Sequence, residues 1–550
     1  MAVTTHDEVQ ATYTPEQAIA EAKRAMEAGF DLEAAKEGCP FKVDIPAYFQ
    51  KVIEGDFDGA LAVIYKSHPF PSTFGRMCHL FCQQATPPLE DVGKAWAEWT
   101  PPEWSLADEY GAEGSWSRGS VPLQRGNSSS GPSRPGVDLP GGRHGGDSSS
   151  APARPAPDSP VGSQAASNRA PPRITWATVA NAIRGVGGGS GIPGGAGIER
   201  PAYLLMERFV GDYGDPAASP VVPEKPSSGK RVAVIGAGSG GLANAWMLRR
   251  LGHEVDVYDS LQVPGGTLFA GYPPHRMAKF GVRRENDPTE WGARFFGGRE
   301  LSKDDVDAII AEYDLTFLSI GKFEPLMVGM PGEDAQNVWN ALYFIAEVGY
   351  GRWPVRGGRC VILGAGHTAS DAAQVARRLG CQIKIFYRRG LDEMPLDGAD
   401  PTEHVSRMSE DGVEYHFLAQ PVRILADTEN RVTGVEFVKT VLGEPDASGR
   451  RSPIPVPGSN FVEPCDIVVE AVGEAVDLSV VPDQLRREGP VVWVDRASHR
   501  TSHPKVFAGG DVIGDRGNDG AAHSGILAAH TMDSILRDEP LVLFEPRPIR

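Results

Sequence analysis

Two glycine-rich turns, each at the end of a short apolar strand and each followed by a helix-forming run, constrain this sequence more than any other feature. The first turn follows Arg231–Ile235 and the second follows Arg359–Leu363. A further apolar strand comes after each expected helix, Glu254–Tyr258 in the first set and Gln382–Tyr387 in the second. Apolar strands that alternate with amphipathic helices predict an α/β fold with doubly wound parallel sheets.

The first turn has the spacing Gly-x-Gly-x-x-Gly. In this pattern Gly236 permits a tight turn, and Gly238 lets a pyrophosphate approach the backbone. Gly241 allows the following helix, expected over Leu242–Arg250, to pack closely on the strand. Asp259 ends the second strand, where a carboxylate accepts hydrogen bonds from an adenosine ribose. Strand, turn, helix and terminal acid together predict a dinucleotide-binding site.

The second turn repeats this plan with Gly364, Gly366 and, in the third small position, Ala369. Its second strand ends in Arg388 and Arg389, where an NAD site carries a carboxylate. Guanidinium groups suit a 2′-phosphate by charge and by bidentate geometry. The alternative is that one of the two arginines only extends to the surface along its aliphatic stem. The pattern favours NADPH over NADH.

A motif near the end of the sequence is expected to belong to the first set of strand, turn, helix and strand, which we call the first unit. Residues 505–511 form an expected short strand that ends in Gly510 and Asp511, and a helix is expected over Gly520–Leu536. A second dinucleotide-binding unit inserted within a first, followed by a returning Gly-Gly-Asp strand, is typical of flavoproteins that bind two dinucleotides.

Composition excludes several other classes of protein. A length of 550 residues favours two to four domains, and the net charge of −18 argues against nucleic-acid binding. No apolar run is long enough for a membrane span, and the N-terminus lacks the apolar region of a secretory signal. Six irregularly spaced cysteines do not form a disulfide framework. We therefore expect a reduced cytoplasmic protein.

Residues 99–197 differ sharply from their surroundings, because Gly, Ser, Pro and Arg dominate there. Such a segment buries too little apolar surface to offset its ordering entropy, so we expect a disordered insert. A genuine linker and a retained or misread stretch of the gene would both produce this composition. The region before it is expected to be helical, with Thr14 as the N-cap of a helix over Ala18–Ala28.

These motifs resemble those of the small (beta) chain of NADPH-dependent glutamate synthase and its oxidoreductase relatives, which include the N-terminal half of dihydropyrimidine dehydrogenase. The resemblance covers nearly the whole chain except residues 99–196. It rests on Gly38-Cys39-Pro40, Gly75-Arg76-Met77-Cys78, Val232–Leu242, Gly266 to Pro273, Gly364–Gly380, Tyr387-Arg388-Arg389, Glu393-Met394-Pro395 and Phe507–Asp511.

The resemblance implies FAD in the first site and NADPH in the second. The implied FAD residues are Gly236, Gly238, Gly241, Asp259, Gly266, Gly510 and Asp511, the last near the ribityl or pyrophosphate part. The implied NADPH residues are Gly364, Gly366, Ala369, Arg388 and Arg389. No catalytic side chain is assigned, because hydride transfer between two cofactors depends on their alignment.

The implied order of domains is a helical domain at 1–98, the insert at 99–197, a linker at 198–229, a first part of the FAD domain at 230–350, the NADPH domain at 351–464, and a second part of the FAD domain at 465–550. The helical domain resembles a ferredoxin-like domain that holds two iron–sulfur clusters.

The chain departs from its relatives at the cysteines that hold two [4Fe–4S] clusters. The two groups of ligand positions are occupied by Ala25, Ala28, Ala35 and Cys39, and by Cys78, Cys82 and Thr86. A cluster needs about four soft ligands, normally thiolates. Three scattered cysteines could hold at best one damaged cluster, so a [4Fe–4S] cluster is doubtful.

The leading hypothesis is an electron-input subunit in which NADPH reduces FAD and electrons pass to a redox partner, either a large subunit or a ferredoxin-like acceptor. One alternative is a standalone NADPH oxidase or quinone reductase. Another is a cluster-free docking or regulatory protein that binds nucleotides without oxidising them.

Overall fold

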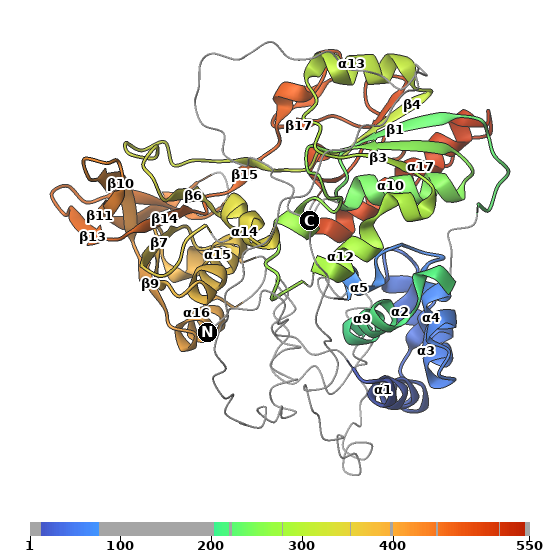
Figure 1. Ribbon diagram of the computed structural model, residues 1–550, viewed down its shortest axis with the longest axis horizontal. Helices are drawn as coiled ribbons and strands as arrows, with labels where there is room; N and C mark the ends of the chain where they lie inside the picture. The colour runs from blue at the N-terminus through green and yellow to red at the C-terminus, as the bar shows by residue number, and fades with distance from the viewer. Residues whose placement is uncertain are drawn as a thin grey trace, which may run out of the picture. The chain divides into compact units, whose positions relative to one another are not determined.

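The computed structural model describes residues 13–75, 203–218, 223–277, 279–352, 354–396, 400–446, 449–515 and 517–544 (Figure 1). The insert expected at 99–197 lies outside these residues. The described chain contains two parallel sheets, a four-stranded antiparallel sheet, two short antiparallel ribbons of two strands each, and an N-terminal group of helices. None of the described helices is both long and apolar enough to cross a membrane.

The first parallel sheet has the strand order β18-β4-β1-β2-β3. Its strands are β1 (Arg231–Ile235), β2 (Glu254–Tyr258), β3 (Arg294–Phe296), β4 (Leu315–Leu318) and β18 (Val506–Ala508). Strand β18 pairs with β4 although the second parallel sheet lies between them in the sequence. This connection confirms the expected insertion of one dinucleotide-binding unit within another.

Helices cover both faces of the first sheet. Val232 and Val234 face α10 (Ser239–Arg250) and α17 (Gly517–Leu536), which lie side by side in Figure 1. The two helices approach closely at Gly525, because a Cβ there would lie 2.2 Å from the carbonyl oxygen of Gly240. Ala233 and other residues of the opposite face pack against α13 (Lys303–Glu312).

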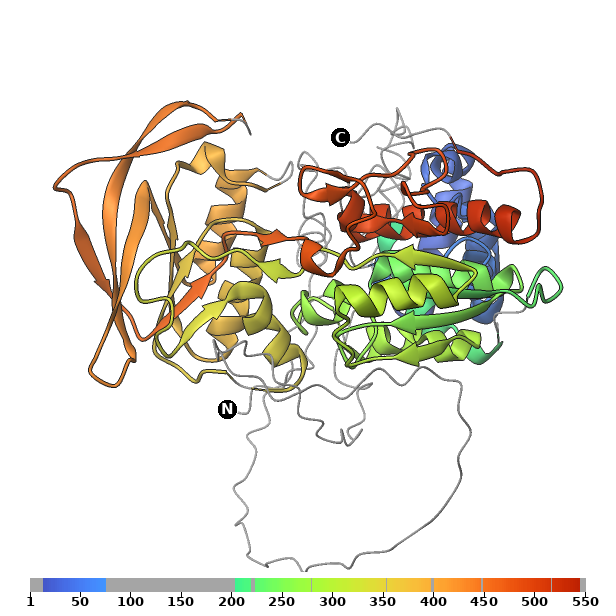
Figure 2. The same cartoon turned by 90° about the horizontal axis from the view of Figure 1, so that it is seen from above.

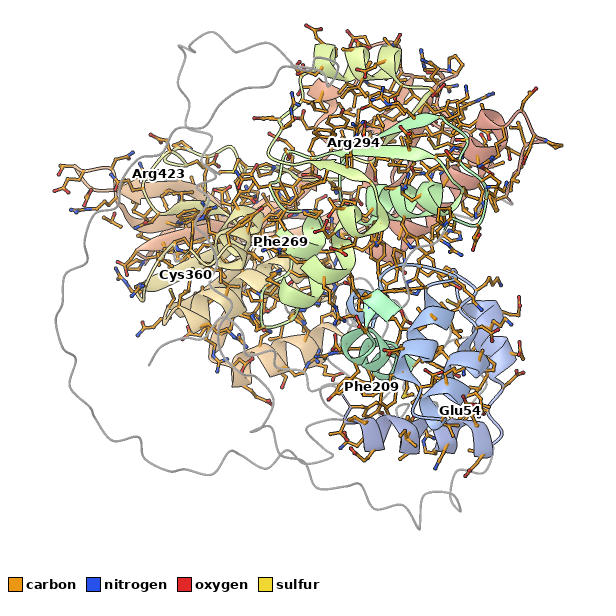
Figure 3. All side chains as sticks on the ribbon, turned by 45° about the vertical axis from the view of Figure 1, so that its right-hand side comes forward. Glu54, Phe209, Phe269, Arg294, Cys360 and Arg423 are labelled. Carbon is orange, nitrogen blue, oxygen red and sulfur yellow. The ribbon has the colours of Figure 1, made fainter. Side chains whose placement is uncertain are left out.

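The second parallel sheet has the order β6-β14-β7-β8-β9. Its strands are β6 (Val338–Asn340), β7 (Arg359–Leu363), β8 (Gln382–Tyr387), β9 (Val413–Phe417) and β14 (Ile467–Glu470). The helices α14 (Ala341–Gly349) and α15 (His367–Arg378) pack on the face that carries Cys360 and Ile362, with α16 (Pro401–Glu410) beside β9. Cys360, marked in Figure 3, and Cys381 are buried in this core, as expected of small structural cysteines.

An antiparallel sheet that the sequence pattern does not predict packs on the other face of the second sheet. It contains β10 (Ala419–Ala426), β11 (Val432–Pro445), β12 (Arg451–Pro455) and β13 (Phe461–Pro464) (Figure 2). The ring of Phe386 on β8 lies 4.1 Å from that of Phe437 on β11, centroid to centroid. A separate two-stranded ribbon of β5 (Glu324–Pro325) and β15 (Glu474–Ala475) lies where the chain leaves and re-enters the first unit.

The N-terminal helices are α1 (Pro15–Glu27), α2 (Leu32–Gly38), α3 (Ile45–Ile53), α4 (Phe57–Ile64), α5 (Pro71–Phe74) and α9 (Tyr203–Tyr213). Thr14 is the N-cap of α1, as expected, and forms a reciprocal capping box with Gln17. Helix α9 packs tightly on α5, since a Cβ on Gly211 would lie 2.1 Å from the backbone nitrogen of Ser72.

The remaining short elements are α11 (Thr267–Ala270), α12 (Lys279–Asn286), β16 (Arg487–Glu488), β17 (Val491–Val492), and the 3₁₀ turns η1 (Pro216–Ala218), η2 (Pro288–Trp291), η3 (Leu391–Glu393), η4 (Leu478–Val480) and η5 (Gly510–Ile513). Helices α10, α15 and α17 begin at Ser239, His367 and Gly517, earlier than the starts at Leu242, Ala369 and Gly520 that the sequence predicts. For α10 and α15, the reason is that the third small residue of each glycine turn belongs to the first turn of the helix.

Candidate dinucleotide-binding sites

The first glycine turn contains two positions that exclude any side chain. Gly236 has a φ of 102°, and a Cβ there would lie 2.1 Å from the carbonyl oxygen of Ser319. A Cβ on Gly241 would lie 1.8 Å from the carbonyl oxygen of Gly236. These contacts fix strand, turn and helix against one another.

Gly238 differs from both, because a Cβ there would meet no atom within 4 Å. It is the N-cap of α10 and gives that helix no side-chain cap. The free backbone N–H groups and the positive end of the helix dipole therefore face open space. This arrangement fits the pyrophosphate of a bound dinucleotide.

Asp259 lies directly after β2 and holds the first turn in place. One carboxylate oxygen accepts from the backbone N–H of Ala237 at 2.6 Å, and the other from that of Leu261 at 2.7 Å. Burial raises the pKa of Asp259 to about 6. Each carboxylate oxygen can accept a second hydrogen bond, so a ribose hydroxyl can still be bound.

The structure brings several other predicted FAD residues to this turn. Gly266, with a φ of 51°, lies against Gly238, and a Cβ on Gly266 would be 2.9 Å from the Gly238 Cα. Gly510 adjoins the turn through Ser319, whose hydroxyl oxygen would lie 3.4 Å from a Cβ on Gly510 and 2.6 Å from a Cβ on Gly240. Asp511 follows at the start of η5, and burial raises its pKa to about 6 while the charge of Lys322 opposes that change.

Sequence reasoning missed Asn518, which joins three elements at this site. Its side-chain oxygen accepts from the hydroxyls of Ser239 at 2.7 Å and Thr267 at 3.2 Å. Asn518 comes from the first turn of α17, Ser239 from that of α10 and Thr267 from that of α11. A polar residue just after the Gly-Gly-Asp strand was the available signal.

The second glycine turn repeats the geometry of the first. Gly364 has a φ of 117°, and a Cβ there would lie 2.2 Å from the carbonyl oxygen of Ala471. Gly366 is the uncapped N-cap of α15, and its nearest neighbour for an added Cβ is Pro395 at 3.4 Å. Ala369 is fully buried where the helix meets the sheet. The turn therefore offers a second phosphate cradle.

The two arginines after β8 have different surroundings. Arg388 is exposed. Arg389 is buried, donates from Nε to the carbonyl oxygen of Arg451 at 2.9 Å, and forms an ion pair with Asp446. Of the two, Arg388 is the one whose side chain is accessible to a ligand.

A polar contact joins the two units near these turns. Arg276, from the loop after α11, forms an ion pair with Asp371 on α15. Nε2 of His275 lies 2.8 Å from the side-chain oxygen of Gln374 on the same helix. These contacts hold a loop of the first unit on the helix that begins at the second phosphate cradle.

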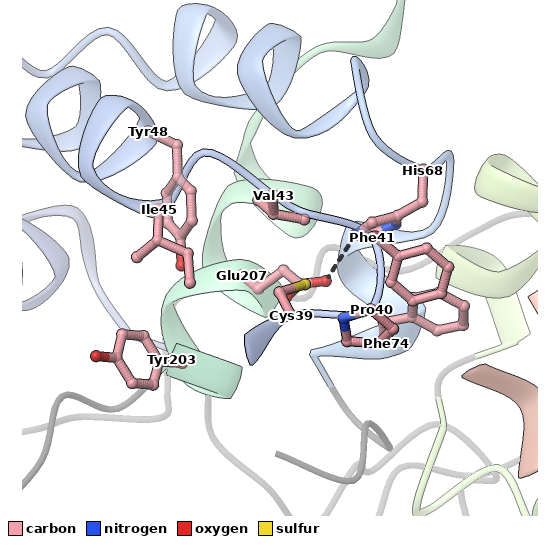
Figure 4. A pocket seen from close by; sticks show the side chains of 10 residues that line it. All are labelled: Cys39, Pro40, Phe41, Val43, Ile45, Tyr48, His68, Phe74, Tyr203 and Glu207. Carbon is pink, nitrogen blue, oxygen red and sulfur yellow. Dashed lines mark ion pairs between the residues drawn. The ribbon is translucent and has the colours of Figure 1, made fainter. Parts of the chain in front are cut away.

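The N-terminal helices contain a small pocket beside Cys39 (Figure 4). His68 forms an ion-pair contact with Glu207 there, with 3.3 Å between Nε2 and Oε1. Burial raises the pKa of the Cys39 thiol to about 11, so the thiol is protonated at neutral pH. The pocket therefore contains no ready thiolate.

The residues at the first group of cluster-ligand positions do not fit a [4Fe–4S] cluster. Ala25 and Ala35 are fully buried, and Cys39 is the one thiol of that group. Among the described residues, no group of three or more His, Cys, Asp or Glu side chains could hold a metal ion. Cys78, Cys82 and Thr86 lie outside the described residues.

The fold and the two phosphate cradles define an α/β protein that binds two dinucleotides. A sequence profile of the family described as pyridine nucleotide-disulphide oxidoreductase matches residues 230–532. A profile of dihydropyrimidine dehydrogenase domain II, 4Fe-4S cluster, matches residues 2–86. The second profile covers the N-terminal helical region, whose sequence resembles an iron–sulfur domain.

Comparison with individual proteins agrees with these two profile matches. NADPH-Fe(3+) oxidoreductase subunit beta of Geobacter sulfurreducens is 37% identical over 292 residues, which are 51% of this chain and 43% of that protein. Glutamate synthase [NADPH] small chain of Escherichia coli K12 is 33% identical over 335 residues, 57% of this chain and 70% of that protein. The chain thus spans less than half the length of the Geobacter relative. The structure of Lactococcus lactis thioredoxin reductase matches with a TM-score of 0.44 and 18% identity, over 56% of this chain and 99% of that one.

The chain belongs to the pyridine nucleotide-disulphide oxidoreductase family, in the group that includes the small chain of NADPH-dependent glutamate synthase. It is an oxidoreductase whose cofactors are FAD and NAD(P)H. The expected family, fold class and enzyme class are confirmed.

Proposed function

We propose that this chain oxidises NADPH with bound FAD and passes the electrons to a partner protein, as an electron-input subunit. The observation that carries the proposal is the contrast between the two cradles. The strand after the first cradle leads to a carboxylate, Asp259, and the strand after the second leads to an exposed guanidinium, Arg388. An acid suits an unmodified ribose, and an arginine suits a 2′-phosphate.

The residues of the chain act by binding and alignment. The N-termini of α10 and α15 bind pyrophosphates, Asp259 binds a ribose, and Asn518 fixes the first turns of α10, α11 and α17 relative to one another. FAD, when bound, supplies the hydride acceptor, so no acid or base side chain is required. Arg276 and Asp371 hold the two units in register.

A partner is proposed because several relatives are described as subunits. They include the NADPH-Fe(3+) oxidoreductase subunit beta, the NADP(+)-dependent formate dehydrogenase subunit beta of Moorella thermoacetica and the glutamate synthase small chain. If neither group of ligand positions holds a cluster, the partner would bring its own cluster or approach the flavin directly.

Anaerobic turnover with NADPH and an artificial dye tests the proposal. We expect the FAD-loaded protein to reduce the dye with NADPH far faster than with NADH. Absence of turnover while FAD is bound would contradict the oxidoreductase role of these sites and favour a regulatory nucleotide-binding protein.

A second candidate function is a standalone NADPH oxidase or quinone reductase. It is supported by the first group of cluster-ligand positions, where Cys39 is the one thiol. With one thiol in the first group of positions, electrons can leave from the flavin without a cluster. Rapid consumption of oxygen or a small quinone by the purified chain alone would favour this candidate. Slow consumption together with fast dye reduction would favour the partner-dependent subunit.

A further inference from the structure

We infer that Tyr272, in the loop after α11, connects bound FAD to the ion pair between Arg276 and Asp371. Its hydroxyl group donates to an oxygen of the FAD pyrophosphate or ribityl chain, and its ring supports the Arg276 guanidinium. The inference rests on the proposed function, because it assigns a positioning residue to the same pair of sites. Tyr272 lies outside both glycine turns.

The backbone around Tyr272 is held in place by hydrogen bonds within the first unit. The backbone N–H of Tyr272 donates to the carbonyl oxygen of Thr267 at 3.1 Å, just beyond the end of α11. The Lys279 ammonium group donates to the carbonyl oxygen of Phe269 at 2.6 Å and also to that of Tyr272. Since the N–H and the carbonyl group of Tyr272 are both bonded, its backbone is fixed relative to α11.

The hydroxyl group of Tyr272 lies at the first phosphate cradle. Nδ2 of Asn518 donates to this hydroxyl group at 3.5 Å. The side-chain oxygen of the same Asn518 accepts from the hydroxyl of Ser239 at 2.7 Å, and Ser239 is the first residue of α10. One amide group therefore joins the Tyr272 hydroxyl to the helix N-terminus that fits the pyrophosphate.

The proton of the Tyr272 hydroxyl can be donated to a ligand. Burial raises the pKa of Tyr272, so the group is protonated at neutral pH. The hydroxyl accepts from Asn518, and within the part of the chain that the structure describes its own proton is donated to no acceptor. A buried donor without an acceptor costs free energy, and phosphate and ribityl oxygens are acceptors. The site therefore fits an oxygen of FAD as that acceptor.

The ring of Tyr272 lies against the contact between the two units. The central carbon of the Arg276 guanidinium is 5.2 Å from the centroid of this ring, within the range of a cation–π interaction. Nη1 of the same guanidinium lies 2.7 Å from both carboxylate oxygens of Asp371 on α15, the helix that begins at the second cradle. A single side chain thus contacts the first cradle through its hydroxyl group and the second unit through Arg276.

This arrangement gives Tyr272 two separable tasks. Loss of the hydroxyl group removes a hydrogen bond to FAD and leaves the ring beside Arg276. Loss of the ring as well removes one of the contacts that hold Arg276 toward Asp371, so the two cofactors are aligned less often. A residue that only filled space would change the stability of the fold without separating FAD affinity from the rate of reduction.

Dilution of the FAD-loaded protein, followed by the fluorescence of released FAD, tests the hydroxyl contact. For Tyr272→Phe we expect the FAD dissociation constant to rise about tenfold, as for loss of one hydrogen bond to a charged group. At saturating FAD, the rate of flavin reduction by NADPH should stay within about twofold of wild type, because the ring remains. An unchanged dissociation constant would overturn the hydroxyl contact.

Tyr272→Leu tests the role of the ring. This variant should weaken FAD binding as much as Tyr272→Phe does. At saturating FAD it should also slow flavin reduction about threefold to tenfold in anaerobic stopped-flow measurements, from the loss of the cation–π contact. A rate equal to that of Tyr272→Phe would overturn the ring contact. Tyr272→Met is measured in the same way, so that the test does not depend on the folding of one variant.

Tyr387→Phe is the matched control for the loss of a buried tyrosine hydroxyl. The Tyr387 hydroxyl donates to the carbonyl oxygen of Glu393 at 2.6 Å within the second unit. Its removal should lower the melting temperature and leave the FAD dissociation constant unchanged. An equal loss of FAD from this control would overturn the inference, because weaker FAD binding would then reflect lower stability alone.

These outcomes are separate from the test of the proposed function. If NADPH does not reduce the flavin of the wild type, the proposed function fails, while FAD release from Tyr272→Phe still decides the hydroxyl contact. If NADPH reduces the wild type and Tyr272→Phe binds FAD as tightly as the wild type does, the inference fails and the proposed function stands.

Discussion

Nη1 of Arg276 lies 2.7 Å from both carboxylate oxygens of Asp371, and this ion pair joins a loop of the first unit to helix α15 of the second. Hydride transfer depends steeply on the distance and alignment of the two cofactors. We predict that Arg276→Gln slows reduction of FAD by NADPH about tenfold, from the loss of one charge-assisted contact, while FAD content is unchanged. Stopped-flow absorbance of the flavin measures this rate.

The charge-reversed double variant Arg276→Asp with Asp371→Arg is the matched control for this pair. It should recover much of the lost rate, since the ion pair can form with its partners exchanged. An equally slow double variant would show that the pair does not set the alignment. A normal rate in Arg276→Gln would show the same.

Substitution of two glycines in the first turn should have two different effects, one on cofactor binding and one on folding. Gly238→Ala adds a methyl group to open space, so we predict a folded protein that loses most of its FAD. Gly241→Ala places a Cβ 1.8 Å from the carbonyl oxygen of Gly236 and should lower the melting temperature or prevent folding. Flavin absorbance and calorimetry distinguish these results. Full FAD content in a folded Gly238→Ala variant would contradict the assigned pyrophosphate site.

The second turn provides the corresponding test for the nicotinamide cofactor. Gly366→Ala should keep FAD and raise the KM for NADPH, because the added methyl group occupies the second cradle. Loss of FAD in this variant would indicate that the two sites have been assigned in the wrong order.

Arg388 and Arg389 should behave differently although they are neighbours. Arg388→Ala removes an exposed cation and should raise the KM for NADPH about tenfold without changing that for NADH. Arg389→Ala removes a buried guanidinium that donates to the carbonyl oxygen of Arg451 and pairs with Asp446, and should lower the free energy of unfolding by about 2 kcal/mol. Steady-state kinetics and urea unfolding give the two readouts. Equal effects on both coenzymes in Arg388→Ala would contradict the 2′-phosphate assignment.

Glu285 on α12 should make stability depend on pH. Its carboxylate accepts from the backbone N–H groups of Ser72 at 2.5 Å and Thr73 at 2.8 Å, at the N-terminus of α5. Burial nevertheless raises the pKa of Glu285 from 4.5 to about 7. Between these values the folded state binds more protons than the unfolded state, so this contribution to stability falls as pH rises.

The variant Glu285→Gln isolates that contribution. From pH 5 to pH 8 we expect the free energy of unfolding of wild type to fall by about 3 kcal/mol relative to the variant. Urea unfolding at both pH values, followed by circular dichroism, measures the difference. A difference that stays constant with pH would show that the buried carboxylate does not change its protonation on folding.

The parallel strands can be predicted from the sequence because the turns that follow them have positions where only glycine fits. Gly236 and Gly364 adopt a φ that favours glycine, and an added Cβ would lie 2.1 and 2.2 Å from carbonyl oxygens, so other residues are excluded and the pattern is visible in the chain. The antiparallel sheet lacks such a signature. Its long strand β11 mixes buried and exposed positions and has a shifted register near Leu442, which obscures simple alternation.

Local sequence patterns also do not predict which charged side chains pair with one another. Arg388 and Arg389 are equivalent in the sequence, and only the return of the β11–β12 hairpin pairs one of them with Asp446. Asn518 likewise reaches the first turn because α17 packs along α10. Contacts between residues this far apart depend on the whole fold, which periodicity and spacing do not encode.

The most direct test of the account is the absorption spectrum of anaerobically purified protein, with flavin and iron analysis, before and after addition of NADPH. We predict about one FAD per chain, bleached by about one equivalent of NADPH, with little iron. A bound FAD that NADPH does not bleach would contradict the central claim, and about four irons per chain would contradict the reading of the ligand positions.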